Sequence, residues 1–139
     1  MVIYQISVFI ENKPGRLEDI IRALSDENIG IRALSVADTT DFGILRLIVS
    51  DTDGAIAAFE KRGITASKTR VIGVKMKDEP GSLAHVLHVL KGADVSVEYA
   101  YAFITHTKNE ACVVLRVENH ERATEALRAG GVELMSEIL

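Results

Sequence analysis

Two kinds of hydrophobic spacing alternate along the chain, and the same succession appears twice. Every second residue is apolar in residues 3–10 and again in residues 70–76, a pattern typical of a β-strand. After each strand the spacing changes to i, i+3, i+4 and i+7, which places apolar residues on one face of a helix. The two helical sets are Leu17, Ile20, Ile21 and Leu24, and, 66 positions later, Leu83, Val86, Leu87 and Leu90.

Two further strands, a second helix and a last strand follow in each half. The expected hairpins pair residues 29–38 with 42–50 and 95–105 with 110–118, the second helices are 53–62 and 120–129, and the last strands are 64–69 and 132–138. Asp51 and Asn119 are expected to cap the second helices, which Gly63 and Gly131 would end. The offset between the halves grows from 66 to 68 within the hairpin, where a surface connection tolerates an insertion.

These elements predict an α+β chain built from two βαββαβ units with antiparallel sheets. The first unit is expected to comprise residues 1–69 and the second residues 70–139. The last strand of the first unit runs into the first strand of the second through residues 67–70, without a linker. The two units are therefore expected to lie close together.

The second strand of each unit is expected to contain a β-bulge. In the first unit, consecutive apolar residues Ile31 and Leu34 are three positions apart, and a bulge would reverse the phase of the strand at that step. The same bulge in the second unit would turn three aromatic residues to the open face of the sheet: Tyr99, Tyr101 and Phe103. Such a patch would be adhesive, so a second chain is expected to cover it. The alternative places these aromatics in the core.

Composition limits the possible partners and surroundings of the protein. Its 139 residues are 47% hydrophobic and 26% charged, as in ordinary globular proteins. The net charge is −4 and basic residues never form a run longer than two, which argues against nucleic-acid and membrane partners. Met1 leads directly into the first strand, no segment is apolar enough to span a membrane, and the protein is expected to be cytoplasmic. The single cysteine, Cys112, is expected to be buried.

A Pro-Gly turn separates the first strand from the first helix in each unit, and each proline is expected in the first helical turn. The turns read Asn12-Lys13-Pro14-Gly15-Arg16-Leu17 and Asp78-Glu79-Pro80-Gly81-Ser82-Leu83. Free N–H groups and the helix dipole at this place suit a carboxylate, and glycine lets a ligand approach the backbone. The first turn carries basic residues and the second acidic ones, so two unequal sites are expected, of which the first is the better anion site.

In the first turn, one candidate binding residue has two possible roles. Asn12 has donors and an acceptor that could orient an amino acid, or it could simply cap the turn locally. Two residues before this position and its repeat partner stand Ile10 and Met76, both apolar. This favours a less polar ligand.

A βαββαβ unit of about 70 residues with such a turn resembles the ACT domain of allosteric enzymes of amino-acid metabolism, and the resemblance covers the whole chain twice. It implies a ferredoxin-like fold whose domains pair side by side in one eight-stranded sheet with the helices on one face. It also implies that an effector, usually an amino acid, binds between domains. The turns and the starts of the second strands would form the sites. The candidate residues are Asn12, Lys13, Pro14, Gly15, Arg16, Leu17, Gly30 and Ile31 in the first unit, and Asp78, Pro80, Gly81, Ser82, Leu83, Ser96 and Val97 in the second.

The sequence thus favours a regulatory protein over an enzyme. It would sense a metabolite, act on a separate metabolic enzyme, form at least a homodimer and need no cofactor. His85 and His88 lie three apart on a helix, but no third ligand has metal-site spacing, so they are interpreted as a solvated helix face and no metal is expected. An RNA-binding sheet would need basic residues beside its aromatics. The alternative left open is an interaction module or regulatory subunit that has lost ligand binding.

Overall fold

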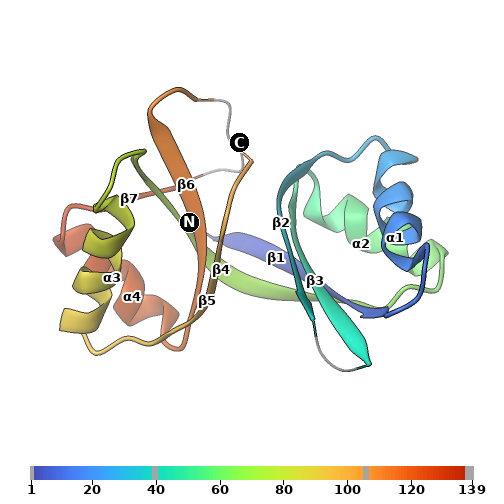
Figure 1. Ribbon diagram of the computed structural model, residues 1–139, viewed down its shortest axis with the longest axis horizontal. Coiled ribbons are helices and arrows are strands. Elements are labelled where there is room, and N and C mark those ends of the chain that lie inside the picture. The colour runs from blue at the N-terminus through green and yellow to red at the C-terminus, as the bar shows by residue number, and fades with distance from the viewer. Residues whose placement is uncertain (1, 39–40, 105–106, 137–139) are drawn as a thin grey trace. The chain divides into compact units, whose positions relative to one another are not determined.

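The computed structural model describes residues 2–38, 41–104 and 107–136, which form four helices and seven strands (Figure 1). Their order is β1 (Ile3–Glu11), α1 (Arg16–Ser25), β2 (Ile31–Asp38), β3 (Phe42–Val49), α2 (Thr52–Lys61), β4 (Ala66–Lys77), α3 (Ser82–Gly92), β5 (Val97–Ala102), β6 (Glu110–Val117), α4 (His120–Ala129) and β7 (Glu133–Leu134). Contacts divide the chain into two compact units. The N-terminal unit is residues 4–69, and the C-terminal unit is residues 70–136 together with residues 2 and 3.

Each unit has the predicted α+β, ferredoxin-like plan with antiparallel strand pairs. In the N-terminal unit β3 lies between β2 and β1, and in the C-terminal unit β6 lies between β5 and β4, with β7 on the other edge of β4. The expected strands at residues 64–69 and 70–76 run into one another without a linker, as predicted, and form the single strand β4 of 12 residues, which begins at Ala66. No glycine or proline in residues 65–72 interrupts the extended backbone. The side-by-side pairing of the units stays a prediction.

The second helix of each unit begins and ends as the sequence predicted. The side chain of Asp51 accepts a hydrogen bond from Gly54 N at 3.0 Å, and that of Asn119 accepts one from Arg122 N at 3.1 Å. After α2, Gly63 adopts a left-handed conformation with φ 69°, which lets Ile64 N donate to a carbonyl of the last helical turn. Both caps are confirmed.

Each unit has its own hydrophobic core between its helices and the helix-facing side of its strands. The N-terminal core contains Ile6, Val8, Ile10, Ile20, Ala23, Leu24, Ile29, Leu45, Leu47, Val49, Ala55 and Phe59. The C-terminal core contains Ile72, Val74, Val86, Leu90, Val95, Leu115, Val117, Ala123 and Leu127. The predicted helix stripes are only partly buried, because Leu17, Leu83 and Leu87 are exposed.

The predicted bulges are present in both units. The pairing register shifts between Ile31 and Ala33 in β2 and between Val97 and Tyr99 in β5. Beyond the bulge, Ala100 lies opposite the core residue Leu115, so its neighbours Tyr99 and Tyr101 point away from the helices. The bulge therefore reverses the strand phase as the apolar spacing indicated.

The expected exposed aromatic patch is wrong, although its residues lie on the predicted face. Phe103 is only 5% exposed, and Tyr99 and Tyr101 are half-buried, with stacked rings whose centroids lie 6.5 Å apart. Mutual stacking covers part of both tyrosine rings. A homodimer stays a prediction, and this patch no longer supports it. In the described ranges, no helix is both long and apolar enough to cross a membrane.

Candidate functional site

The first helix of each unit begins without a side-chain cap, unlike the second. Gly15 and Gly81 occupy the N-cap positions with φ 85° and 94°, a left-handed conformation that suits glycine, and no side chain in the described ranges caps α1 or α3. Pro14 and Pro80 precede these glycines, so the expectation that they lie in the first helical turn is wrong. Arg16 N and Ser82 N donate to the carbonyls of Lys13 and Glu79, and the N–H groups that follow them in the first turn have no side-chain cap within the described ranges.

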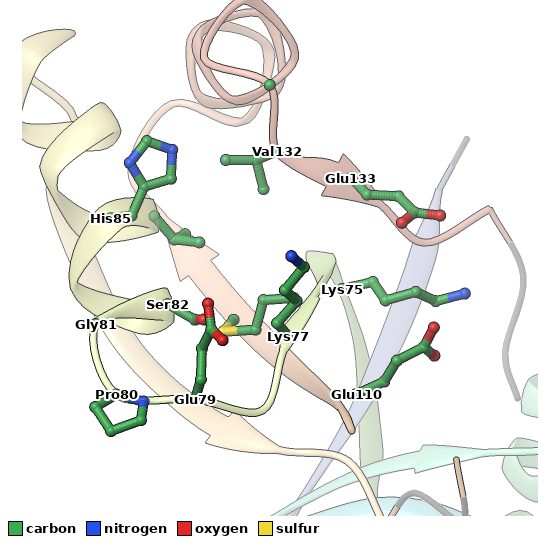
Figure 2. Close-up of a pocket in the computed structure, with 13 residues that line it drawn as sticks. Lys75, Lys77, Glu79, Pro80, Gly81, Ser82, His85, Glu110, Val132 and Glu133 are labelled. Carbon is green, nitrogen blue, oxygen red and sulfur yellow. The ribbon is translucent and has the colours of Figure 1, made fainter. Parts of the chain in front are cut away.

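An open cavity of about 750 Å³ lies at the start of α3 in the C-terminal unit (Figure 2). In the described residues the pairing of β7 with β4 does not extend beyond Lys75 toward the end of β4, and the next residues, Met76 and Lys77, line this space. The lining residues are Lys75, Met76, Lys77, Glu79, Pro80, Gly81, Ser82, His85, Val86, Glu110, Gly131, Val132 and Glu133. Of the predicted site residues, the structure brings Pro80, Gly81 and Ser82 to this cavity.

Charged side chains of both signs surround the cavity, and we call them the five pocket charges: Lys75, Lys77, Glu79, Glu110 and Glu133. Lys75 lies directly opposite Glu133 on β7, and Lys77 directly opposite Glu110 on β6. The side chains of directly paired residues point to the same side of a sheet, so these four side chains lie together. None of the five forms an ion pair with another residue of the described ranges.

A buried thiol lies next to these charges. Cys112 is buried as predicted, and it pairs directly with Lys75 across β4 and β6. Burial raises the pKa of the thiol, and the carboxylates of Glu110 and Glu133 raise it further against the opposing effect of Lys75. The thiol therefore stays protonated at neutral pH and serves as a small apolar residue.

The two histidines of α3 are placed differently with respect to the cavity. His85 lines it, with Nε2 at 3.4 Å from the carbonyl oxygen of Gly130, whereas His88 is exposed and does not line it. In the part of the chain that the structure describes, no three histidine, cysteine or carboxylate side chains are arranged to hold a metal ion.

The N-terminal unit has a cavity of about 470 Å³ at the corresponding place, the start of α1. Its lining residues are Phe9, Ile10, Glu11, Arg16, Asp19, Ile20, Phe42, Arg62, Gly63, Ile64 and Thr65. All of these except Arg62 match a lining residue of the C-terminal cavity at the repeat offset of 66 or 68. The fold therefore builds the same cavity twice. Among the site residues predicted for this unit, only Arg16 lines it.

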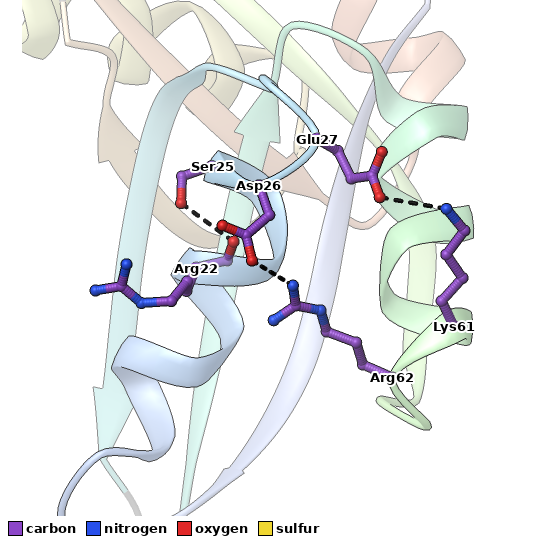
Figure 3. Close-up of polar contacts among 6 residues, drawn as sticks. All are labelled: Arg22, Ser25, Asp26, Glu27, Lys61 and Arg62. Carbon is purple, nitrogen blue, oxygen red and sulfur yellow. Dashed lines mark hydrogen bonds and ion pairs between the residues drawn. The ribbon is translucent and has the colours of Figure 1, made fainter.

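The charges at the N-terminal cavity are engaged with one another. Arg16 Nη1 lies 3.7 Å from Asp19 Oδ2, and Glu11 Oε2 lies 3.1 Å from Lys13 Nζ. The hydrogen bond and charge of Lys13 hold the pKa of the Glu11 carboxyl below its usual value. Arg62 is ion-paired with Asp26 at the end of α1 (Figure 3). Ligand groups would have to compete with these pairs.

The predicted residues of the second strands lie at the far end of each unit from the turns. Ile31 pairs with Val49 at one end of β3, whereas Glu11, next to the turn, pairs with Phe42 at the other. Gly30 N donates to Ser50 Oγ at 2.9 Å. A site that used both the turn and the second strand would therefore need residues from two copies of the domain, as the resemblance implied.

The other predicted residues lie outside both cavities. They are Asn12, Lys13, Pro14, Gly15, Leu17, Gly30 and Ile31 in the N-terminal unit and Asp78, Leu83, Ser96 and Val97 in the C-terminal unit. Val97 and Ile31 pack against the cores. Whether these residues contact a ligand stays a prediction.

The charged residues that strands contribute to the C-terminal cavity were not among the residues predicted from the sequence. Lys75 and Glu110 align with Phe9 and Phe42 of the first unit, so a charge replaces an aromatic ring at two equivalent positions. That difference was visible in the repeat. Its meaning depended on the cross-strand register, which places both residues at one cavity.

Comparisons with known proteins agree with this architecture. The model of the ACT domain pair family matches residues 1–137. The chain is similar to protein BT0572 from Bacteroides thetaiotaomicron, with 41% identity, a TM-score of 0.91, and coverage of 97% of this chain and 92% of that chain. No curated protein matches the sequence.

Two solved structures with lower identity have the same fold. They are the regulatory subunits of aspartate kinase from Thermus thermophilus, in the ligand-free form, and from Thermus flavus. Each is 16% identical to this chain; the TM-scores are 0.68 and 0.62, and the coverage is 92% and 94% of both chains, respectively. The resemblance inferred from the Pro-Gly turns and the repeat is confirmed by the match over residues 1–137, and the chain belongs to the ACT domain pair family.

Proposed function

We propose that this protein is a regulator that binds a small metabolite, an amino acid, and acts on a separate enzyme without being an enzyme itself. The observation that carries the proposal is the cavity at the uncapped start of α3 in a chain of the ACT domain pair family. The likeness to regulatory subunits of aspartate kinase supports a regulatory role through a partner enzyme.

The chemistry of the cavity suits an amino acid. The N–H groups and the dipole at the start of α3 favour a carboxylate. Glu79, Glu110 and Glu133 supply carboxylates that favour an ammonium group nearby. An α-amino acid carries both groups on one carbon atom, so a single small molecule satisfies the two preferences.

Ligand-induced stabilisation tests the proposal. The urea midpoint of the full chain is measured with each of the twenty standard amino acids at millimolar concentration. A ligand that binds only the folded protein adds about 2.7 kcal/mol of stability at 100 times its dissociation constant. We expect at least one amino acid to raise the midpoint. If none does, the protein is not an amino-acid sensor.

A second candidate function, a docking module without ligand binding, is favoured by the exposed side of β2. In the described ranges β2 pairs only with β3, and its residues Leu34 and Val36 are 42% and 49% exposed although they follow the core-facing phase of the strand. An unpaired strand edge with apolar side chains suits another chain. In this case Val36→Lys would abolish association in sedimentation experiments, and no amino acid would change the midpoint.

A further inference from the structure

We infer that the C-terminal cavity alone is the ligand site, and that it takes an α-amino acid with an apolar side chain. The N-terminal cavity has become a structural remnant. This inference rests on the proposed function and goes beyond it by assigning the unit, the residues and the ligand class.

The charges around the two equivalent cavities differ in whether they are already paired. Arg16, Asp19 and Glu11 in the N-terminal cavity already have oppositely charged partners within 3.7 Å. The five pocket charges of the C-terminal cavity have no ion-pair partner in the described residues, although oppositely charged ones face each other across adjacent strands. A zwitterion placed among them gains charge-assisted hydrogen bonds without breaking any existing pair.

The five pocket charges fall into two groups, each of which contains both signs. In Figure 2, the Lys77 side chain extends into the middle of the cavity, and Glu79 rises beside it from the turn. Lys75 extends away from α3, toward the side where Glu110 and Glu133 lie. The carboxylate of the ligand would bind Lys77 and the start of α3, and its ammonium group would bind Glu110 and Glu133, which outnumber Lys75 on their side of the cavity.

Apart from Ser82 and His85, the side chains of the remaining wall are apolar. Val86 belongs to the C-terminal core, and Met76 and Val132 pack against it. A ligand side chain directed to this wall would find no hydrogen-bond partners among these three residues, so an apolar side chain is favoured over a polar one. The two cavities also differ in size, because the C-terminal one is about 750 Å³ and the N-terminal one about 470 Å³.

Charge-neutralising substitutions at matched positions test this assignment. Lys77→Gln and Glu110→Gln change the C-terminal cavity, while Glu11→Gln, at the position equivalent to Lys77, and Asp19→Asn change the N-terminal one. Glu110 is half-buried and the other three residues are exposed. Circular dichroism and urea midpoints establish that the variants fold. Binding of the twenty standard amino acids to the full chain is measured by calorimetry.

We expect an apolar amino acid to bind the unmodified chain, and Lys77→Gln and Glu110→Gln each to weaken it about tenfold or more. Glu11→Gln and Asp19→Asn should change its affinity less than about twofold, because these side chains line the other cavity and already form ion pairs within the protein. If the ligand binds and the C-terminal variants retain full affinity, the assignment is wrong while the proposed function stands. If only a polar amino acid binds, the ligand class is wrong. If no amino acid binds the unmodified chain, both are wrong.

Discussion

The two units follow one plan, yet they hold their paired helices together by different means. In the N-terminal unit, Lys61 Nζ lies 3.3 Å from Glu27 Oε1, and Arg62 pairs with Asp26, so two ion pairs connect the ends of α1 and α2 (Figure 3). The equivalent positions of the C-terminal unit hold only small residues, which are Gly92, Ala93, Ala129 and Gly130. Polar contacts in one unit are replaced by close packing in the other.

The close packing occurs at Gly130. A Cβ atom at this position would lie 2.8 Å and 2.9 Å from the two methyl groups of Val89 on α3, and 3.3 Å from the carbonyl oxygen of Ala126. Glycine therefore allows α3 to approach the end of α4. It also leaves no counterpart to the Arg62 side chain, which lines the N-terminal cavity. Glycine at the position equivalent to Arg62 thus allows closer packing of the two helices and leaves the larger cavity without a charged side chain at that position.

Matched truncations of the two cores are expected to have the largest effect. Leu47 and Leu115 are repeat equivalents, and both are fully buried, each in the core of its own unit. Leu47→Ala and Leu115→Ala should each cost about 2–5 kcal/mol of unfolding free energy, because both leave a cavity. Urea denaturation measures the cost, and amide exchange should locate the loss of protection in the unit that carries the substitution.

Leu17→Ala serves as the control, because this residue of α1 is 42% exposed and leaves little cavity. Its effect should stay near about 0.5 kcal/mol. Loss of protection spread equally over both units by either core variant would show that the cores do not act separately.

A smaller effect is expected where the units differ. Gly130→Ala should destabilise the protein by about 1–3 kcal/mol, because Val89 is β-branched and stiff in a helix and the helices must move apart. Arg62→Ala, at the equivalent position, removes only a surface ion pair and should cost less than about 1 kcal/mol. Urea midpoints of both variants measure the difference. Equal losses would contradict the view that packing and ion pairing have exchanged roles.

Local patterns in the sequence predicted most of the fold. The caps Asp51 and Asn119, the helix end at Gly63 and the bulge after Ile31 each depend on a few neighbouring residues, and each is confirmed. The apolar stripes were less reliable, as the exposed Leu17 shows, because the width of the buried face depends on which strands lie beneath the helix.

The candidate site was harder to predict, because it depends on contacts between distant segments. The turn Pro80–Ser82 was found by its motif, and it lines the cavity. Lys75 and Glu110 escaped notice, because only the pairing of β4 with β6 brings them to the same place. The burial of Phe103 likewise follows from tertiary packing and not from the phase of β5.

The smallest expected effect is a pH dependence that only the C-terminal unit should have. His120, the first residue of α4, replaces Thr52 at the start of α2, and its Nδ1 atom is buried with no hydrogen-bond partner in the described residues. Burial lowers the pKa of this histidine, the positive charge of Arg70 lowers it further, and the neighbouring Glu121 opposes the shift.

A histidine whose pKa is lowered on folding binds its proton more readily in the unfolded chain. Stability should therefore be complete above the unfolded pKa of about 6.5 and decrease as the pH falls from there toward the folded value. His120→Thr introduces the residue that the N-terminal unit has at the equivalent position. It should make the urea midpoint less dependent on pH between pH 7.5 and about 5.5. His88→Gln, the loss of an exposed histidine from α3, is the control. If His120→Thr leaves the pH dependence unchanged, the buried Nδ1 atom does not contribute to it, and the two units respond alike to acid despite their different helix starts.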